Sequence, residues 1–157
     1  MEVTLIHRII AEGSEHMKPL MGTYNPTMDA KGRMAFPAKL RDQLGAGFVI
    51  TIGFEGCLYV YSEDEFERLD QKLAEVAGTA GRQALRRIYA GSEYPECDKQ
   101  GRIQISQKLR EYAGLDHDIT VIGNRNRAEI WDTARYEEQN AKFSDEELAA
   151  ALDGIAF

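Results

Sequence analysis

Features that this sequence lacks exclude several classes of protein. No apolar run approaches the roughly 20 residues that a membrane-spanning helix needs. The first residues, Met1–Ala11, mix charged side chains among apolar ones and form no signal-peptide core. Cysteine is scarce: Cys57 and Cys97 give no disulfide framework and fit a reducing compartment. We therefore expect a cytoplasmic protein that has no membrane partner.

Signatures of catalysis are missing as well. The sequence contains no Gly-x-Ser-x-Gly elbow, no phosphate-binding Walker A loop and no cluster of histidines with cysteines. Carboxylates are abundant but fall mostly on the faces of expected helices, where nothing singles out an acid–base pair. We predict that the protein is not an enzyme and has no catalytic residue, metal site, cofactor or small-molecule substrate.

The acidic charge of the chain is unevenly distributed. The net charge is −7, whereas a DNA-binding domain is usually basic. Acid is concentrated in Glu63–Glu75 and Glu137–Asp153, while residues 29–45 and 98–114 each hold four basic side chains against two acidic ones. Because DNA responds to the local potential and not to the total charge, a basic face can coexist with an acidic one.

One half of the chain nearly repeats the other. Residues 29–45 read DAKGRMAFPAKLRDQLG and residues 98–114 read DKQGRIQISQKLREYAG, so Asp, Gly, Arg, Lys, Leu, Arg and Gly coincide at a constant offset. After a one-residue slip, Val49–Gly53 matches Ile119–Gly123. Two halves that share a core bury more apolar surface than either would alone. We predict two pseudo-symmetric halves around a common core.

Each repeat opens with a tight turn. Asp29 and Gly32 hold the first and fourth positions of Asp-Ala-Lys-Gly, a pattern that favours a type I turn followed by a glycine in the left-handed conformation. Asp98 and Gly101 repeat this chemistry in Asp-Lys-Gln-Gly. Alternating apolar residues follow each turn and predict a strand.

The remaining pattern predicts short strands and capped helices. Pro37 suits a helix start, Gly45 and Gly114 suit helix ends, and Ser62 with Glu65 suits a capping box. The expected further strands are Gly22–Met28, Phe48–Gly53, Cys57–Tyr61, Ser92–Cys97, Asp118–Gly123 and Ala128–Trp131. The expected helices are Ala38–Leu44, Glu63–Ala77, Arg82–Ala90, Gln107–Ala113, one that Asp132 or Thr133 caps, and Asp145–Leu152 after Ser144.

These motifs resemble the MraZ family, in the AbrB-like swapped-hairpin group. The resemblance rests on the two Asp-x-x-Gly-Arg turns, each followed by an apolar strand and a Lys-Leu-Arg helix, and on Ile130-Trp131-Asp132. It covers roughly residues 22–142. It implies an α+β, mostly β fold: two AbrB-like swapped-hairpin halves that form a shared barrel with peripheral helices. It also implies a ring-shaped homo-oligomer and sequence-specific binding to repeated promoter sites of the division and cell-wall gene cluster.

The two turns supply the candidate DNA-binding residues. Arg33 and Arg102 are expected to contact DNA, because the planar guanidinium can bond guanine or phosphate with two donors at once. At the loop tips, Lys31 and Lys99 are expected to contact phosphates. The residues expected to fix and orient the loops are Asp29, Gly32, Asp98 and Gly101.

Other interpretations stay open at this point. The Asp–Arg pairs could do no more than stabilise their turns, and Arg125 with Arg127 fits a solvated loop better than a DNA contact. Instead of a nucleoid-associated regulator, the chain could be a non-catalytic assembly protein or an antitoxin-like DNA-binding partner. Two fused halves argue against an antitoxin, which usually has one short half with a disordered tail.

The expected division of the chain follows the repeat. Residues 1–18 form a flexible N-terminal extension, for which Met17 and Met21 are alternative starts. Residues 19–77 form the first AbrB-like half and residues 78–91 a linker with a helix. Residues 92–142 form the second half, and residues 143–157 an acidic helical tail.

Overall fold

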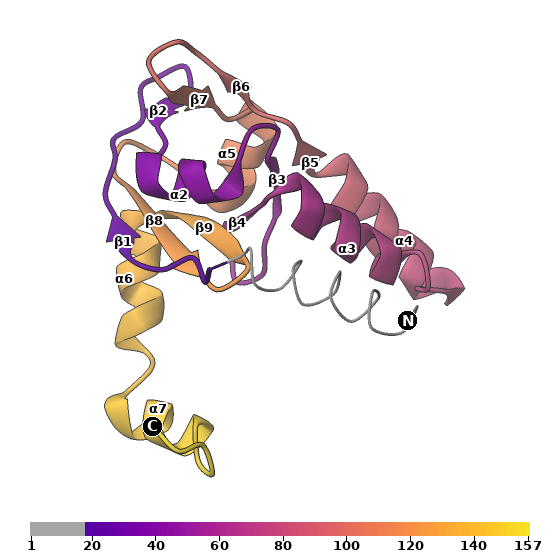
Figure 1. Cartoon of the computed structure of the whole chain (residues 1–157), viewed down its shortest axis with the longest axis vertical. Coiled ribbons are helices and arrows are strands. Elements are labelled where there is room, and N and C mark those ends of the chain that lie inside the picture. The colour runs from indigo at the N-terminus through magenta and orange to yellow at the C-terminus, as the bar shows by residue number, and fades with distance from the viewer. Residues whose placement is uncertain (1–17) are drawn as a thin grey trace, which may run out of the picture.

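Two antiparallel sheets organise the computed structural model, which describes residues 18–157 (Figure 1). One sheet has six strands in the order β1-β8-β9-β4-β3-β5, and the other has three in the order β2-β7-β6. The expected extension, residues 1–18, lies outside the described residues except for Lys18. The strands are β1 (Thr23–Tyr24), β2 (Arg33–Ala35), β3 (Val49–Ile52), β4 (Leu58–Tyr61), β5 (Ser92–Glu93), β6 (Glu96–Cys97), β7 (Arg102–Gln104), β8 (Ile119–Asn124) and β9 (Arg127–Asp132).

Strands from the two halves of the repeat pair with each other. Strand β2 pairs with β7, where Met34 lies opposite Ile103, the residue at the same position of the second repeat. In the larger sheet, β4 pairs with β9, β1 with β8, and β3 with β5. Among the described strands, only the hairpins β3–β4, β6–β7 and β8–β9 lie within one half. Each half therefore completes the sheets of the other.

The core belongs to both halves. On the short β2–β7 ribbon, alternation turns Met34 and Ile103 inward, and they are at most 1% exposed. Their cluster continues through apolar side chains of β3, β4, β8 and β9, among them Ile50, Leu58, Val60, Ile119, Val121 and Ile130. One shared cluster explains why a chain of this length does not need two separate cores.

Several helices follow the sequence prediction closely. Helices α2 (Ala38–Leu44) and α5 (Gln107–Ala113) occupy the predicted residues, and Ser106 caps α5 by accepting a hydrogen bond from the Leu109 N–H. Asp132 caps α6 (Thr133–Ala141) in the same way. Helix α7 (Asp145–Ala151) begins with a complete capping box formed by Ser144 and Glu147.

Two helices differ from their predicted bounds. Helix α3 (Glu63–Leu73) ends four residues before the predicted Ala77, and α4 (Gly78–Ala90) begins four residues before the predicted Arg82. A β-carbon on the buried Gly81 would lie 2.8 Å from Val76 Cγ1, so packing against this glycine fixes the turn. Ser62 accepts from the Glu65 N–H as predicted, but the Glu65 carboxylate pairs with Arg68 instead of completing the box.

The expected mixed α/β class with antiparallel strands is confirmed, but the expectation that strands dominate is wrong. Helices cover more of the described residues than strands do, in part because the predicted strands at residues 22–28 and 92–97 are broken into short pieces. Within residues 18–157, no strand pairing closes either sheet into a barrel. No described helix is long and apolar enough to span a bilayer.

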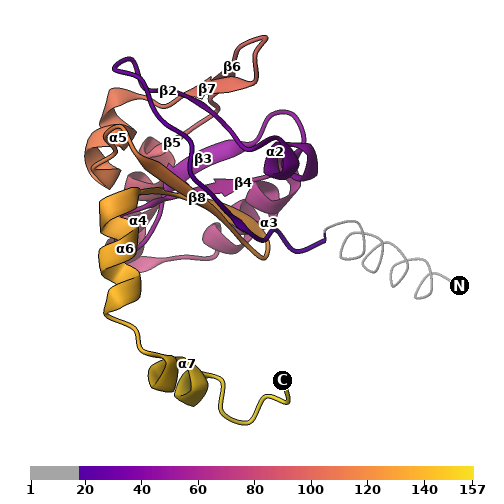
Figure 2. The ribbon, with the colours of Figure 1, turned by 90° about the vertical axis from the view of Figure 1, so that its left-hand side faces the viewer.

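The helices lie around the sheets, and the β2–β7 ribbon lies at one end of the molecule. Helices α3 and α4 run side by side, whereas α6 leads the chain away from the sheets and α7 lies beyond it (Figures 1 and 2). The β2–β7 ribbon and the loops that precede its strands form the end of the molecule opposite α7 (Figure 2).

Candidate nucleic-acid interface

The first turn is held by one aspartate. Oδ1 of Asp29 accepts the backbone N–H groups of Lys31 (3.0 Å) and Arg33 (2.9 Å), and Oδ2 accepts Nε–H of Arg33 at 2.7 Å. The Gly32 N–H donates to the Asp29 carbonyl at 3.0 Å, and Gly32 has a φ of 81°. A single carboxylate thus fixes the loop backbone and the direction of the arginine together.

The second turn repeats this arrangement. Asp98 Oδ1 accepts from the N–H groups of Gln100 and Arg102, both at 2.9 Å, and Oδ2 accepts Nε–H of Arg102 at 2.7 Å. Gly101 has a φ of 78°. The sequence repeat is therefore a repeat of geometry, down to the distance between carboxylate and guanidinium.

Each aspartate bonds one nitrogen of its arginine side chain and leaves the terminal amino groups available for other hydrogen bonds. Only Nε of Arg33 and of Arg102 bonds the aspartate, and among residues 18–157 the terminal amino groups of both have no protein partner. The side chains of Arg33 and Arg102 are each 38% exposed. The outward edge of the guanidinium, with its paired N–H donors, is the part that can bond an acceptor from outside.

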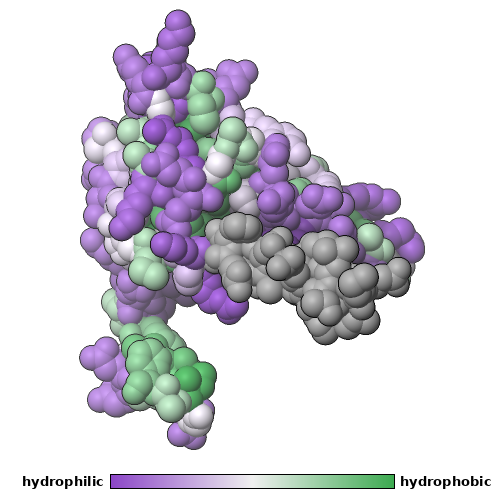
Figure 3. Space-filling view, viewed as in Figure 1, coloured by the Kyte–Doolittle hydropathy of each residue, from purple (hydrophilic) through white to green (hydrophobic). Residues whose placement is uncertain are grey.

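Both arginines lie on the same face of the β2–β7 ribbon. Arg33 is opposite Gln104 and Arg102 is opposite Ala35, so these residues share the face that points away from Met34 and Ile103. Diagonal neighbours on such a pair are about 7–8 Å apart. Figure 2 shows the two loop tips at the same end of the molecule, and hydrophilic side chains project there in Figure 3. Lys31 and Lys99 are exposed at these tips.

Each loop rests on an arginine from the other half, which the sequence analysis missed. Arg41 of α2 donates from Nη1 to the Gly101 carbonyl at 3.1 Å, and Arg110 of α5 packs against Gly32 while its Nε donates to the Ile105 carbonyl at 3.0 Å. These are the arginines of the repeated Lys-Leu-Arg motif. Their repetition was visible in the sequence, but their partners lie in the opposite repeat.

The two loops differ in one support. The side chain of Gln104 donates to the Lys31 carbonyl at 2.9 Å and so braces the tip of the first loop. The matching position in the first repeat is Ala35, which has no group to brace the second loop. The first loop is therefore the more firmly held of the two.

Hydrogen bonds lower the pKa of both loop aspartates. The backbone N–H of Arg33 holds the pKa of the Asp29 carboxyl below its ordinary value, and the Arg33 side chain adds to this effect. The backbone N–H of Arg102 does the same for Asp98. Each carboxylate therefore stays charged into more acidic solution than a free aspartate does.

We expect acid to release the loops only at low pH. Because the folded pKa is lowered, the support is complete above the unfolded pKa of about 3.9 and is lost as the pH falls through the lower folded value. In an NMR titration, the amide shifts of Lys31 and Arg33 should have a midpoint below that of a free aspartate. Asp29→Asn should remove this titration while the Arg102 amide still titrates. A midpoint at the free value would contradict the assignment.

Arg127 takes part in a different cluster from the loops. It belongs to β9, not to the solvated loop that was expected, and its Nη2 donates to Glu129 at 3.0 Å while its guanidinium lies 3.8 Å from the centre of the Tyr59 ring. Glu129 is 6% exposed and also accepts from Trp131 Nε1 at 3.0 Å. The partners of Glu129 lie on β8 and β9, and the contact of Arg127 with the Tyr59 ring links β9 to β4.

We looked for a metal-binding cluster and for a reactive thiol among the described residues. Within residues 18–157, no group of three or more His, Cys, Asp or Glu side chains is placed to hold a metal ion. Burial raises the pKa of the Cys57 thiol to about 12, so this thiol is protonated at neutral pH. Cys97 is exposed at the end of β6.

Comparison with known proteins shows the family to which the chain belongs. The family model described as "MraZ protein, putative antitoxin-like" matches the chain twice, over residues 20–87 and 88–154. Proteins named "Transcriptional regulator MraZ" are similar over most of their length. The one from Lachnoclostridium phytofermentans is 43% identical over 80% of this chain and 90% of its own. Those from Leifsonia xyli subsp. xyli and Salinispora tropica are 45% and 44% identical, over 78% and 86% of this chain and 87% and 96% of their own. The chain belongs to the MraZ family.

Proposed function

We propose that this protein is a sequence-specific DNA-binding transcriptional regulator that works through its two Asp-x-x-Gly-Arg loops. The observation that carries the proposal is the matched geometry of the loops, in which each aspartate orients an arginine whose outward donors are free among the described residues. The relatives named transcriptional regulators support the same class of function. The protein acts on DNA at the nucleoid and not as an enzyme.

The loop residues have distinct roles in this proposal. Arg33 and Arg102 bond base edges or phosphates with their terminal amino groups, and Lys31 and Lys99 contact phosphates. The orienting residues are Asp29, Gly32, Asp98 and Gly101. Only contacts to base edges discriminate between sequences directly, so the arginines carry the specificity and the lysines add affinity.

Assembly multiplies the weak binding of one pair of loops. We propose that residues 19–77 and 92–142 are swapped-hairpin halves of a shared barrel, joined by residues 78–91, and that copies form a ring. A ring that presents many loops raises their effective concentration at a repeated site. This also reconciles the net charge of −7 with DNA binding, because the local potential at the loops governs contact with phosphates.

Footprinting on the promoter of the division and cell-wall gene cluster tests this function. We expect protection of short, evenly spaced repeats at a fixed salt concentration, with no protection of a shuffled promoter of equal composition. Absence of any protected sequence would overturn the proposal. It would favour a non-catalytic assembly protein.

A further inference from the structure

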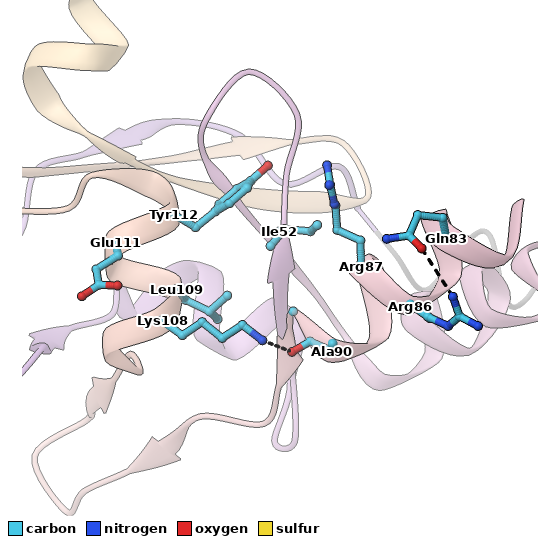
Figure 4. Close-up of a pocket in the computed structure, with 10 residues that line it drawn as sticks. Ile52, Gln83, Arg86, Arg87, Ala90, Lys108, Leu109, Glu111 and Tyr112 are labelled. Atoms are coloured by element: carbon cyan, nitrogen blue, oxygen red, sulfur yellow. Dashed lines mark hydrogen bonds between the residues drawn. The ribbon is translucent and has the colours of Figure 1, made fainter. Parts of the chain in front are cut away.

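A groove with an apolar floor lies between α4 and α5. It has a volume of about 610 Å³, and its floor is formed by Ile52, Leu109 and Tyr112 (Figure 4). The hydroxyl of Tyr112 donates to the Gly53 carbonyl at 2.6 Å, so this ring is fixed while 41% of its surface remains exposed. A fixed and partly exposed aromatic floor is typical of a surface that receives another apolar group.

The rim of this groove is basic. Arg86 and Arg87 of α4 and Lys108 of α5 line it, against Glu111 as the acidic residue among its described lining. Lys108 reaches across to the Ala90 carbonyl at 3.2 Å, whereas the side chain of Arg87 makes no hydrogen bond with residues 18–157. Figure 4 shows Arg87 and Tyr112 extending in the same direction on either side of Ile52. The groove therefore suits a segment that is acidic and apolar together.

The C-terminal tail, residues 143–157, has this composition. It contains no lysine or arginine, and its acids are Asp145, Glu146, Glu147 and Asp153. Leu148 and Ile155 are 48% and 61% exposed, and with Leu152 and Phe157 they line an open hollow of about 360 Å³. Figure 3 shows this apolar surface at the free lower end of the molecule. A small protein rarely leaves such a surface uncovered in its working state.

The tail does not cover its surface within its own chain. In the described structure, hydrogen bonds of residues 145–157 reach no residue before Ser144. Helix α6 carries α7 away from the sheets, and in Figure 1 α4 lies on the other side of the molecule. The groove that matches the tail is therefore more accessible to the tail of another copy.

We propose that the C-terminal tail of one copy docks into the α4–α5 groove of a second copy of this chain. Charge complementarity carries the proposal: a segment with four acids and no basic residue faces a rim with three basic side chains, and apolar side chains meet across the centre. The contact rests on the homo-oligomer of the proposed function. Tail and groove are different surfaces, so the contact is head-to-tail, the type that generates rings.

Charge exchange in the full chain tests this contact. We expect Arg86→Glu with Arg87→Glu, and separately Glu146→Lys with Asp153→Lys, to weaken assembly by on the order of a hundredfold in analytical ultracentrifugation, because like charges then meet across the interface. Glu147 is left unchanged because it completes the capping box of α7. Combining all four substitutions should restore assembly.

Controls separate this contact from misfolding. Arg68→Glu with Lys72→Glu on α3 makes the same charge change outside the groove and should leave assembly unchanged. Circular dichroism melting should match the parent for each variant. Failure of the four-fold variant to reassemble, or normal assembly of the groove variant, would overturn the contact.

Cross-linking decides whether the contact joins two copies. A zero-length carbodiimide should link the Lys108 amine to a tail carboxylate in a mixture of ¹⁴N- and ¹⁵N-labelled protein. Mixed-isotope cross-links support docking between copies, whereas links confined to one isotope overturn it. The DNA-binding proposal can be refuted separately. If protein that assembles gives no footprint, that function is refuted and the tail contact still stands.

Discussion

Arg33→Ala is expected to abolish specific promoter binding while the protein stays folded. A bidentate arginine contact contributes about 1–3 kcal/mol of discrimination between bases, and every copy in an assembly loses it at once. The Asp29–Arg33 pair is exposed and screened by solvent, so its loss should change the free energy of unfolding little. A gel shift with promoter and shuffled DNA, together with a urea melt, measures both quantities.

Arg68→Ala is the matched control, because Arg68 also pairs with a nearby carboxylate but lies on α3, away from the loops. It should bind the promoter like the parent protein. Arg33→Lys keeps the charge but loses the planar fork, and so should retain non-specific binding while losing sequence preference. Arg102→Ala should also weaken binding. If folded Arg33→Ala binds the promoter as well as the parent does, the role assigned to this arginine is wrong.

Gly32→Ala is expected to unfold part of the population or to displace the first loop. Its φ of 81° strains any L side chain, and the new β-carbon would lie 2.6 Å from both the Ile105 carbonyl oxygen and Arg110 Nε. Left-handed strain alone costs about 1–3 kcal/mol. The contact with a backbone oxygen adds to this cost, because that atom cannot rotate away as a side chain can.

Gly78→Ala separates the two causes of lost stability, which are the left-handed backbone strain and the close contact of the new β-carbon. Gly78 has a φ of 83°, but a β-carbon there would meet nothing within 4 Å. Urea melts of both variants should therefore show a smaller loss for Gly78→Ala, and the difference measures the steric contact of Gly32. Equal losses would mean that the close approach of Arg110 and Ile105 does not matter for stability.

Local chemistry accounts for the features that the sequence predicts well. The turn from Asp29 to Gly32 depends on one carboxylate and one left-handed glycine, which lie within four residues of each other. Helices α2 and α5 follow from a helix start and a glycine stop. The difference in support between the two loops could also have been predicted, because Gln104 and Ala35 occupy matching positions of the two repeats.

Contacts between the halves explain what the sequence did not predict. The roles of Arg41 and Arg110 depend on glycines of the opposite repeat, so no local pattern reveals them. Arg127 was assigned to a loop because one of its partners, Tyr59, becomes a neighbour only when β9 pairs with β4. The early start of α4 has a local origin instead, since packing of the buried Gly81 against Val76 outweighs the low helix propensity of glycine.

The β2–β7 pairing has a consequence for synthesis on the ribosome. When the first half emerges, β2 has no partner strand and β4 lacks β9, so Met34 and Leu58 are without the residues that lie opposite them, Ile103 and Ile130. We therefore expect a nascent chain that stops before residue 92 to lack most of both native sheets and to be open to proteolysis. Two co-expressed fragments, divided within residues 78–91, should recover the native fold only when they associate with each other. A complementation assay would measure this association.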